Sequence, residues 1–574
     1  MEAQRFAQWM DAFFDSYYRL RPVNGTFIGR HDFDHLLPDC SDEGVAQSGR
    51  EAGDLLAQVA RIDRSTLSPL ELMDLDAAAG SLRIQRWEAE SEHTWRGNPS
   101  LALGEAIFGV IGLLLTEYAP ASARAAAAMD RMNAIPALLH GARSAIHSAP
   151  LAWAQKALTE CAGGRALFAR GIQRWASDCG VVDGLLEAAA SSALAAVNDY
   201  ALWLEDLLRS APRVTVAAGA DALALHCSDG HFLEQSPDEI ERYAEEALHE
   251  AHAELARRAG AMGASDWRSL LAALVQPHPS TKTYLRRFRE LWESSRALAE
   301  ERDLLTWPDI PIRYVAQPHW AREAAPSLYF LFYRAPACYA RPPVHEYLVT
   351  PIEGSMSQQE QMRLLQANND SVIKLNHVVH HGGIGHHVQN WHAYRGPSRI
   401  GQVAAVDCAS RIALFCGGTM AEGWACYATT LMHEAGFLSA QEELSEAHTR
   451  ARMAARAIVD VRLHQGRMGL EQAAEFYQQN TAMSVVAAQA EATRNSMFPG
   501  AALMYLVGHD SILELRAQMQ RQQGSAFRLR EFHDSFLDWG SLPVALVARA
   551  MRAGHKAPLT EPAHALLKME NSNA

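Results

Sequence analysis

Six of the 25 histidines of this chain fall between His377 and His392. Gly382, Gly383 and Gly385 interrupt the cluster, and a glycine inside a helix costs about 1 kcal/mol relative to alanine. We therefore expect this segment to kink or to approach a ligand closely instead of running as a regular helix. Imidazole is the commonest protein ligand for transition metals and the usual proton-transfer group near neutral pH.

The spacing of the histidines limits how they could share an ion. Residues three or four positions apart lie on the same face of a helix. His380 and His386 are six positions apart, which puts them about 120° out of phase on a helix of 3.6 residues per turn. They converge only if the backbone between them bulges. Glu422, in an apolar run downstream, adds a carboxylate, so the three side chains have the donor types of a metal site.

Composition bounds the class of protein. The chain has 574 residues, of which 48% are hydrophobic and 21% charged, as is typical of a soluble globular protein. A net charge of -14 argues against a nucleic-acid surface. The start of the chain lacks an apolar signal-peptide core, and the apolar run 106–115 is too short to span a bilayer and indicates a buried core helix. Eight scattered cysteines without a C-x-x-C pair indicate reduced core thiols. We expect a cytoplasmic protein that binds neither nucleic acid nor membrane.

Most of the chain has the apolar periodicity of helices, and no fixed-period repeat is present. The clearest expected helices are 185–208, 238–258, 358–379, 421–435, 445–463, 470–480 and 501–522. Residues 1–308 are interpreted as the helical N-terminal part of the fold, and 309–574 as the part that carries the catalytic chemistry. We expect both to belong to one continuous structural unit.

Residues 310–350 differ from their surroundings, because β-branched and aromatic runs replace the helical pattern. Three such runs, at 311–315, 327–333 and 347–350, predict a small antiparallel sheet or strand set just before the histidine cluster. Such a sheet either binds an extended substrate at its edge or serves as a structural hairpin that caps the core.

Several ordered motifs resemble one family, the bacterial domain-of-unknown-function 885 proteins, which are metallopeptidase-like and carry H-E-x-x-P-G-H followed by E-G-W-x-x-Y. The matching residues are His380, Gly385-His386, Gln389 and Glu422-Gly423-Trp424-Ala425-Cys426-Tyr427, then Arg456, Asp460, His464, Glu491, Arg494, Pro499-Gly500, Tyr505, Gly508, Phe532-His533-Asp534 and Gly540-Ser541-Leu542-Pro543. Near the start, Gly25-Thr26 to Asp34 also resembles the family's opening segment. The resemblance touches nearly the whole chain and is densest after residue 335.

This resemblance implies a mainly α fold, a large helical gluzincin-like architecture with a small β-sheet before the metal-site helix. It also implies that His380, His386 and Glu422 bind zinc. The chain departs from the family pattern where His381 replaces the glutamate after the first histidine and Ile384 replaces the proline. A further family glutamate, at the end of the second motif, is Thr429 here.

The first departure bears directly on the chemistry, because in zinc hydrolases that glutamate acts as the general base and acid. His381 is therefore a candidate catalytic proton shuttle, an extra metal ligand, or neither. Tyr505 and His533 are catalytic candidates that would donate a hydrogen bond to a developing oxyanion, with buried structural bonding as the alternative. Arg494 is a candidate substrate-binding residue for a carboxylate; its alternative is an internal ion pair with Glu491 or Asp460.

The leading hypothesis is a metal-dependent enzyme of the peptidase or amidase class, acting on an amide bond of a small molecule or short peptide with His381 as the altered base. Zn²⁺ is the expected cofactor, with Fe²⁺ as the alternative. Two histidines and one carboxylate are also the ligand set of non-haem iron enzymes, so lyase, isomerase or oxygenase chemistry is a second hypothesis. A non-catalytic binding protein is the third. A homodimer is compatible with each of them.

Overall fold

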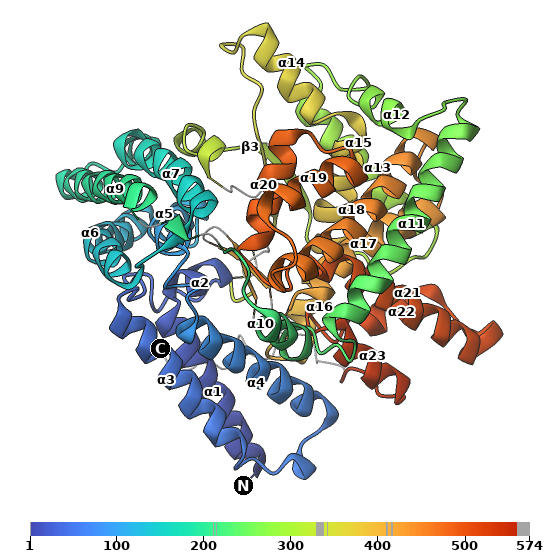
Figure 1. Ribbon diagram of the computed structural model, residues 1–574, viewed down its shortest axis with the longest axis horizontal. Coiled ribbons are helices and arrows are strands. Elements are labelled where there is room, and N and C mark those ends of the chain that lie inside the picture. Colours follow the sequence, from blue (N-terminus) through green and yellow to red (C-terminus); the bar gives the residue numbers. More distant parts are fainter. Residues whose placement is uncertain are drawn as a thin grey trace.

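The computed structural model describes residues 2–558 apart from 211, 214, 329–337, 341, 404, 409–410 and 415–416. About 70% of the chain is helical, which confirms the mainly α fold. Figure 1 shows the helices of the N-terminal third on one side of the molecule and those of the last third on the other. In the described part of the chain no helix is long and apolar enough to cross a membrane.

Among the described residues, thirteen α-helices precede the small sheet that leads to the histidines. They are α1 (Glu2–Leu20), α2 (Pro22–Ile28), α3 (Asp42–Val59), α4 (Pro69–Glu90), α5 (Pro99–Leu115), α6 (Ala121–Ala145), α7 (Leu151–Ala166), α8 (Ile172–Asp178), α9 (Gly184–Ser210), α10 (Ala220–Leu225), α11 (Pro237–Ala261), α12 (Trp267–Ala273) and α13 (Tyr284–Glu301). The expected core helix at 106–115 forms the second half of α5. All residues of α5 from Pro99 to Leu114 are buried, as expected of an element that is apolar on every face.

Ten α-helices follow the small sheet in the part of the chain that the structure describes. They are α14 (Gln358–Ala367), α15 (Asp370–Val372), α16 (His386–Arg395), α17 (Thr419–Glu434), α18 (Ala440–His464), α19 (Leu470–Thr481), α20 (Val485–Ser496), α21 (Met504–Gln523), α22 (Leu529–Leu537) and α23 (Val544–Arg552). The helix α18 begins at a capping box, in which the Ser439 hydroxyl accepts from the Glu442 backbone and the Glu442 carboxylate accepts from the Ser439 backbone.

A close crossing of α17 and α21 positions the helix that carries Glu422. Gly423 and Gly508 face each other where these two helices cross. A Cβ atom at Gly508 would collide with the carbonyl oxygen of Thr419, so only glycine allows the backbones to approach this far. Helix α11 packs against α18, and the two helices lie side by side in Figure 1.

The small sheet is present, but its strand direction was wrongly expected. Strand β3 (Ile312–Ala316) pairs with β4 (His345–Val349) in parallel, with Tyr314 opposite Tyr347. Parallel strands need a long connection between them, whereas a short hairpin turn joins antiparallel strands. The third expected strand, at 327–333, falls almost entirely outside the described residues. Two further pairs are β1 (Ala149–Pro150) with β2 (Pro212–Arg213) and the antiparallel β5 (Ala405–Cys408) with β6 (Arg411–Leu414).

Two expected helices differ from the observed ones near the histidines. The segment 358–379 is not one helix: α14 ends at Ala367, and the Asn369 side chain then caps a new start by accepting from the Val372 backbone. The segment 501–522 begins as a turn, and its helix starts only at Met504. The largest cluster of core side chains includes residues from both sides of position 308, for example Phe13 and Trp424.

Candidate metal centre

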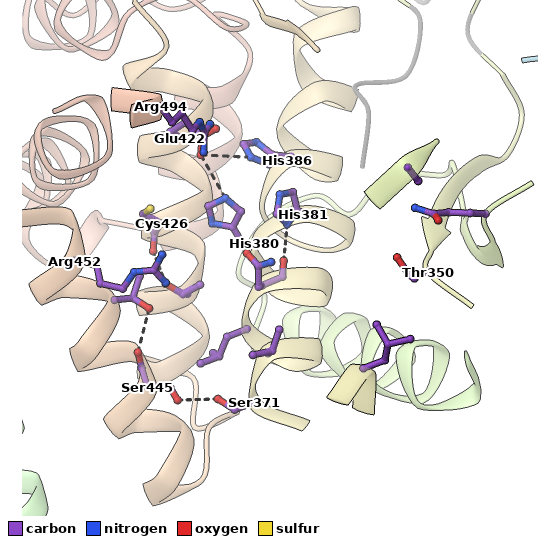
Figure 2. Close-up of a pocket in the computed structure, with 18 of the residues that line it drawn as sticks. Thr350, Ser371, His380, His381, His386, Glu422, Cys426, Ser445, Arg452 and Arg494 are labelled. Carbon is purple, nitrogen blue, oxygen red and sulfur yellow. Dashed lines mark hydrogen bonds and ion pairs between the residues drawn. The ribbon is translucent and has the colours of Figure 1, made fainter. Parts of the chain in front are cut away.

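The histidine segment forms a π-helix, the rare helix type in which each N–H bonds a carbonyl five residues back. It runs from Ile373 to Gly382 and is followed by a tight turn and α16, which starts at His386. Adjacent residues His380 and His381 both face the same cavity, and the turn brings His386 back beside them. Figure 2 shows the three imidazoles grouped opposite α17. The glycines thus mark a departure from regular α-helix, as the sequence predicts.

The turn between the two helices is held by close packing and by two tryptophans. A Cβ atom at Gly385 would collide with the His380 carbonyl oxygen, so a larger residue would force His386 away from His380. The indole N–H of Trp292 donates to the Gly382 carbonyl, and that of Trp424 donates to the Ile384 carbonyl, each at 2.9 Å. Trp424 lies two positions after Glu422, so one helix supplies both the carboxylate and a contact that fixes the turn.

The carboxylate of Glu422 completes the group. Its Oε2 atom lies 3.4 Å from Nε2 of His380 and 3.8 Å from Nε2 of His386. One nitrogen atom from each of His380, His381 and His386 lies within 4.8 Å of the others. The side chain of Gln389, one turn into α16, hydrogen-bonds His386 and also donates to the Ser541 hydroxyl. Through Gln389, residues outside the group of His380, His386 and Glu422 help to fix the orientation of the His386 ring.

The protonation states of His386 and Glu422 suit the binding of a cation. Burial lowers the pKa of His386 to about 4, although the charge of Glu422 acts in the opposite direction. Burial by itself raises the pKa of Glu422, but the hydrogen bond from His380 and the nearby His386 outweigh it and lower the pKa to about 2. At pH 7 the site therefore combines a neutral His386 with an ionised carboxylate, the forms that bind metal ions.

The tautomer of His381 follows from its hydrogen bond. Its Nδ1 atom lies 2.7 Å from the carbonyl oxygen of Asn376, which only accepts, so Nδ1 carries the proton. The Nε2 atom of a neutral His381 therefore has its lone pair available. Burial, together with His380 and His386, lowers the pKa of His381 well below its ordinary value. In this tautomer Nε2 is the ring nitrogen that is able to take up a proton or to bind a metal.

The donor separations fit a divalent transition metal. Tetrahedral zinc with bonds of about 2.0–2.2 Å places neighbouring donor atoms roughly 3.3–3.6 Å apart. The separation between His380 and Glu422 falls in this range, and that between His386 and Glu422 is only slightly longer. Imidazole nitrogen and carboxylate oxygen are donors that zinc and ferrous iron both accept.

The group opens onto a cavity of about 1090 Å³, which is large enough for a short peptide. Tyr505 and Arg494 both line this cavity, so the structure brings these two expected site residues to the same space as the histidines. The guanidinium of Arg456 lies over the Tyr505 ring, 4.8 Å from its centre. Of the two expected acidic partners of Arg494, Glu491 pairs with Arg456, and Asp460 accepts three backbone N–H groups at Gly500, Ala502 and Leu503.

His533 is not placed for the catalytic role expected from the sequence. It is fully buried and is not among the residues that line the cavity. Its Nδ1 atom donates to the Leu304 carbonyl at 2.6 Å, and its Nε2 atom lies 2.7 Å from the Tyr427 hydroxyl. Both nitrogens are therefore used within the core, behind the helix that carries Glu422. The buried structural alternative describes His533 better.

Two residues that contribute to the site do not belong to the sequence motifs. Arg452 lies in the cavity wall on α18, and its only sequence signal is its position four residues before Arg456, on the same helix face. The carbonyl of Asn376 sets the tautomer of His381, and only the structure reveals it.

The family model for bacterial proteins of unknown function, DUF885, matches residues 22–551. The chain belongs to the DUF885 family. Within that match lie His380, His386 and Glu422. No curated protein matches the sequence.

Solved structures share the DUF885 chain's fold over nearly its whole length. One is a candidate lipoprotein of unknown function from Shewanella oneidensis, 21% identical, with a TM-score of 0.76, covering 95% of this chain and 99% of its own. Another is a candidate lipoprotein from Colwellia psychrerythraea, 18% identical, with a TM-score of 0.75, covering 96% of this chain and 99% of its own. At these identities the likeness extends to the fold alone.

Proposed function

We propose that this protein is a metal-dependent hydrolase that cleaves an amide bond of a short peptide or small molecule. The observation that carries the proposal is the convergence of His380, His386 and Glu422 at zinc-like separations on the wall of a large cavity. Zn²⁺ is the cofactor that this donor set favours first.

A bound divalent metal would supply Lewis-acid polarisation of a carbonyl and would activate water. The chain's own residues supply the proton transfers and the positioning. His381 lies beside His380 and His386 and would accept a proton on Nε2, while its Nδ1–H donates to the Asn376 carbonyl. This arrangement gives His381 the proton-shuttle role that a glutamate has in the family motif.

Elemental analysis of full-length protein purified without a metal-affinity tag tests the metal. We expect about one transition-metal ion per chain. His380→Ala should lose the ion, whereas His249→Ala, an exposed histidine on α11, should retain it. Equal metal content in both variants would remove the proposal. Hydrolysis of a mixed short-peptide library, followed by mass spectrometry with and without restored Zn²⁺, then tests the reaction.

A second candidate is non-hydrolytic chemistry at ferrous iron. The observation in its favour is that two imidazoles and one carboxylate form the centre while His381 stands in place of the acidic base. Reconstitution separates the two candidates: turnover that appears with Fe²⁺ under anaerobic loading and is absent with Zn²⁺ supports iron chemistry, and peptide cleavage with Zn²⁺ excludes it.

A further inference from the structure

Beside the metal centre, the cavity wall carries a group of arginines. Arg452 and Arg456 come from the same face of α18, and Arg494 comes from α20. Figure 2 shows Arg494 at the level of Glu422 and Arg452 at the level of Cys426, one turn further along α17. Burial, together with the charge of Glu422, raises the pKa of the Cys426 thiol, while the nearby arginines Arg456, Arg450 and Arg452 act in the opposite direction.

Two arginines of this part of α18 form direct ion pairs with carboxylates. Arg456 pairs with Glu491, whose Oε1 atom lies 2.5 Å from its Nε, and both side chains are largely buried. Arg450, the neighbour of Arg452 in sequence, pairs with Asp510 through both of its terminal nitrogens. Each of these arginines thus has an acidic partner.

Arg452 differs from its neighbours. Its Nε atom is buried and has no hydrogen-bond partner among the residues that the structure describes. Burial and the charge of Arg456 lower its pKa. The charge of Glu491, the partner of Arg456, acts in the opposite direction. A buried N–H group without a hydrogen-bond acceptor is costly, and a planar carboxylate that accepts two N–H groups of the guanidinium would give Arg452 a direct partner. Because Arg452 lines the cavity, such an anion would reach it from the substrate side.

We propose that the substrate carries a free carboxylate, which Arg452 binds. Arg452 and the three histidines line the same cavity, so a substrate held by its carboxylate at Arg452 would present a bond near that end to the histidines. The enzyme would then remove short units from the carboxyl end of its substrate. This last step rests on the proposed function; the anion site does not.

Binding without metal and without turnover tests the anion site by itself. EDTA-treated full-length protein is titrated calorimetrically with N-acetyl-Ala-Ala, which ends in a carboxylate, and with its C-terminal amide. We expect the acid to bind at least about tenfold more tightly, because a hydrogen-bonded charge pair is lost with the amide. Equal affinities would overturn the proposal.

Matched variants test whether Arg452 causes the preference for the acid over the amide. Arg452→Gln should abolish most of the difference between acid and amide, and Arg521→Gln, on the exposed end of α21, should leave it intact. Arg452→Lys keeps the charge but loses the planar fork, so it should retain a reduced preference; this second variant serves if the glutamine form does not fold. An unchanged preference in either Arg452 variant contradicts the assignment.

Inorganic phosphate separates a carboxylate site from a general anion site. We expect phosphate to compete weakly with N-acetyl-Ala-Ala. Tighter binding of phosphate than of the peptide acid would overturn the carboxylate assignment. Because these measurements use metal-free protein, absence of hydrolysis would count against the proposed function and leave the anion site standing.

Discussion

The Nε2 atom of His380 lies 3.4 Å from Oε2 of Glu422 and connects the π-helical segment to α17. A buried carboxylate this close to an imidazole either pairs with a proton on the ring or shares a cation with it. The Nε2 atom of His386 lies 3.8 Å from the same oxygen, so one carboxylate oxygen is near both rings, as it would be around a shared cation.

Glu422→Gln keeps the shape of the side chain but removes the anionic donor. Outer-shell changes at metal sites already cost about 10–100-fold in affinity, so loss of a ligand charge should cost at least about 100-fold. Competition with a chromogenic chelator measures the affinity. The exposed Glu205→Gln on α9 is the control and should behave as the unaltered protein. Unchanged affinity in Glu422→Gln would mean that the carboxylate is not a ligand.

His381→Glu restores the residue type that the family motif has at this position. If the site is hydrolytic, the variant should retain the metal and cleave peptides at least as fast as the unaltered protein, because a carboxylate base would replace the imidazole. His381→Ala should also retain the metal but lose roughly 10²–10⁴-fold in rate. Metal-bound protein that stays inert in all three forms would favour a binding role for the pocket.

The crossing of α17 and α21 predicts a stability effect. Gly508→Ala places a methyl group against the Thr419 carbonyl and should lower the free energy of unfolding by about 1–3 kcal/mol, as overpacking usually does. Gly260→Ala in α11 has open space around it and should be neutral or stabilising by about 0.5–1 kcal/mol. Chemical denaturation measures both. Equal effects of the two substitutions would show that the crossing tolerates a side chain.

Acid should destabilise the protein through its buried histidines. Burial lowers the pKa of His533 to about 3, so its neutral form stabilises the fold fully above the ordinary histidine pKa of about 6.5. That contribution is lost as the pH falls from about 6.5 toward 3. Thermal unfolding scans between pH 8 and pH 4 should show a falling Tm, and His533→Gln should have a lower Tm at pH 8 but a shallower fall.

His433 provides a contrast of opposite sign. The hydrogen bond with Glu446 raises its pKa, so its protonated form stabilises the fold below its ordinary pKa and this contribution is lost as the pH rises. His433→Gln should therefore make the acid loss of Tm steeper. A shallower loss would contradict the ion pair with Glu446.

The sequence predicts most helices near the site because they carry long apolar periodicities. The helix expected at 421–435 is observed as α17, two residues earlier at its start. The break after Ala367 was missed because Asn369 acts through a local cap, which a periodic pattern does not register. Strand direction was also missed, since the alternation of residues in β3 and β4 is the same for parallel and antiparallel pairing.

The candidate site was predicted in part. Glycines and histidines in one short segment indicate a kinked metal-binding turn, and the structure brings His380 and His386 together there. The sequence left two roles open for His533, because a histidine in a motif looks the same whether it faces a cavity or the core. The importance of Arg452 depends on which acidic residues reach its neighbours, which sequence distance does not encode.

The π-helical register of Ile373–Gly382 makes the number of residues in this segment part of its chemistry. An insertion or deletion of a single residue would rotate His380 and His381 by about a quarter turn, away from Glu422. Natural length variants at this place should therefore be rare among active relatives, and protein engineers should graft the stretch from Ile373 to His386 as one uninterrupted cassette.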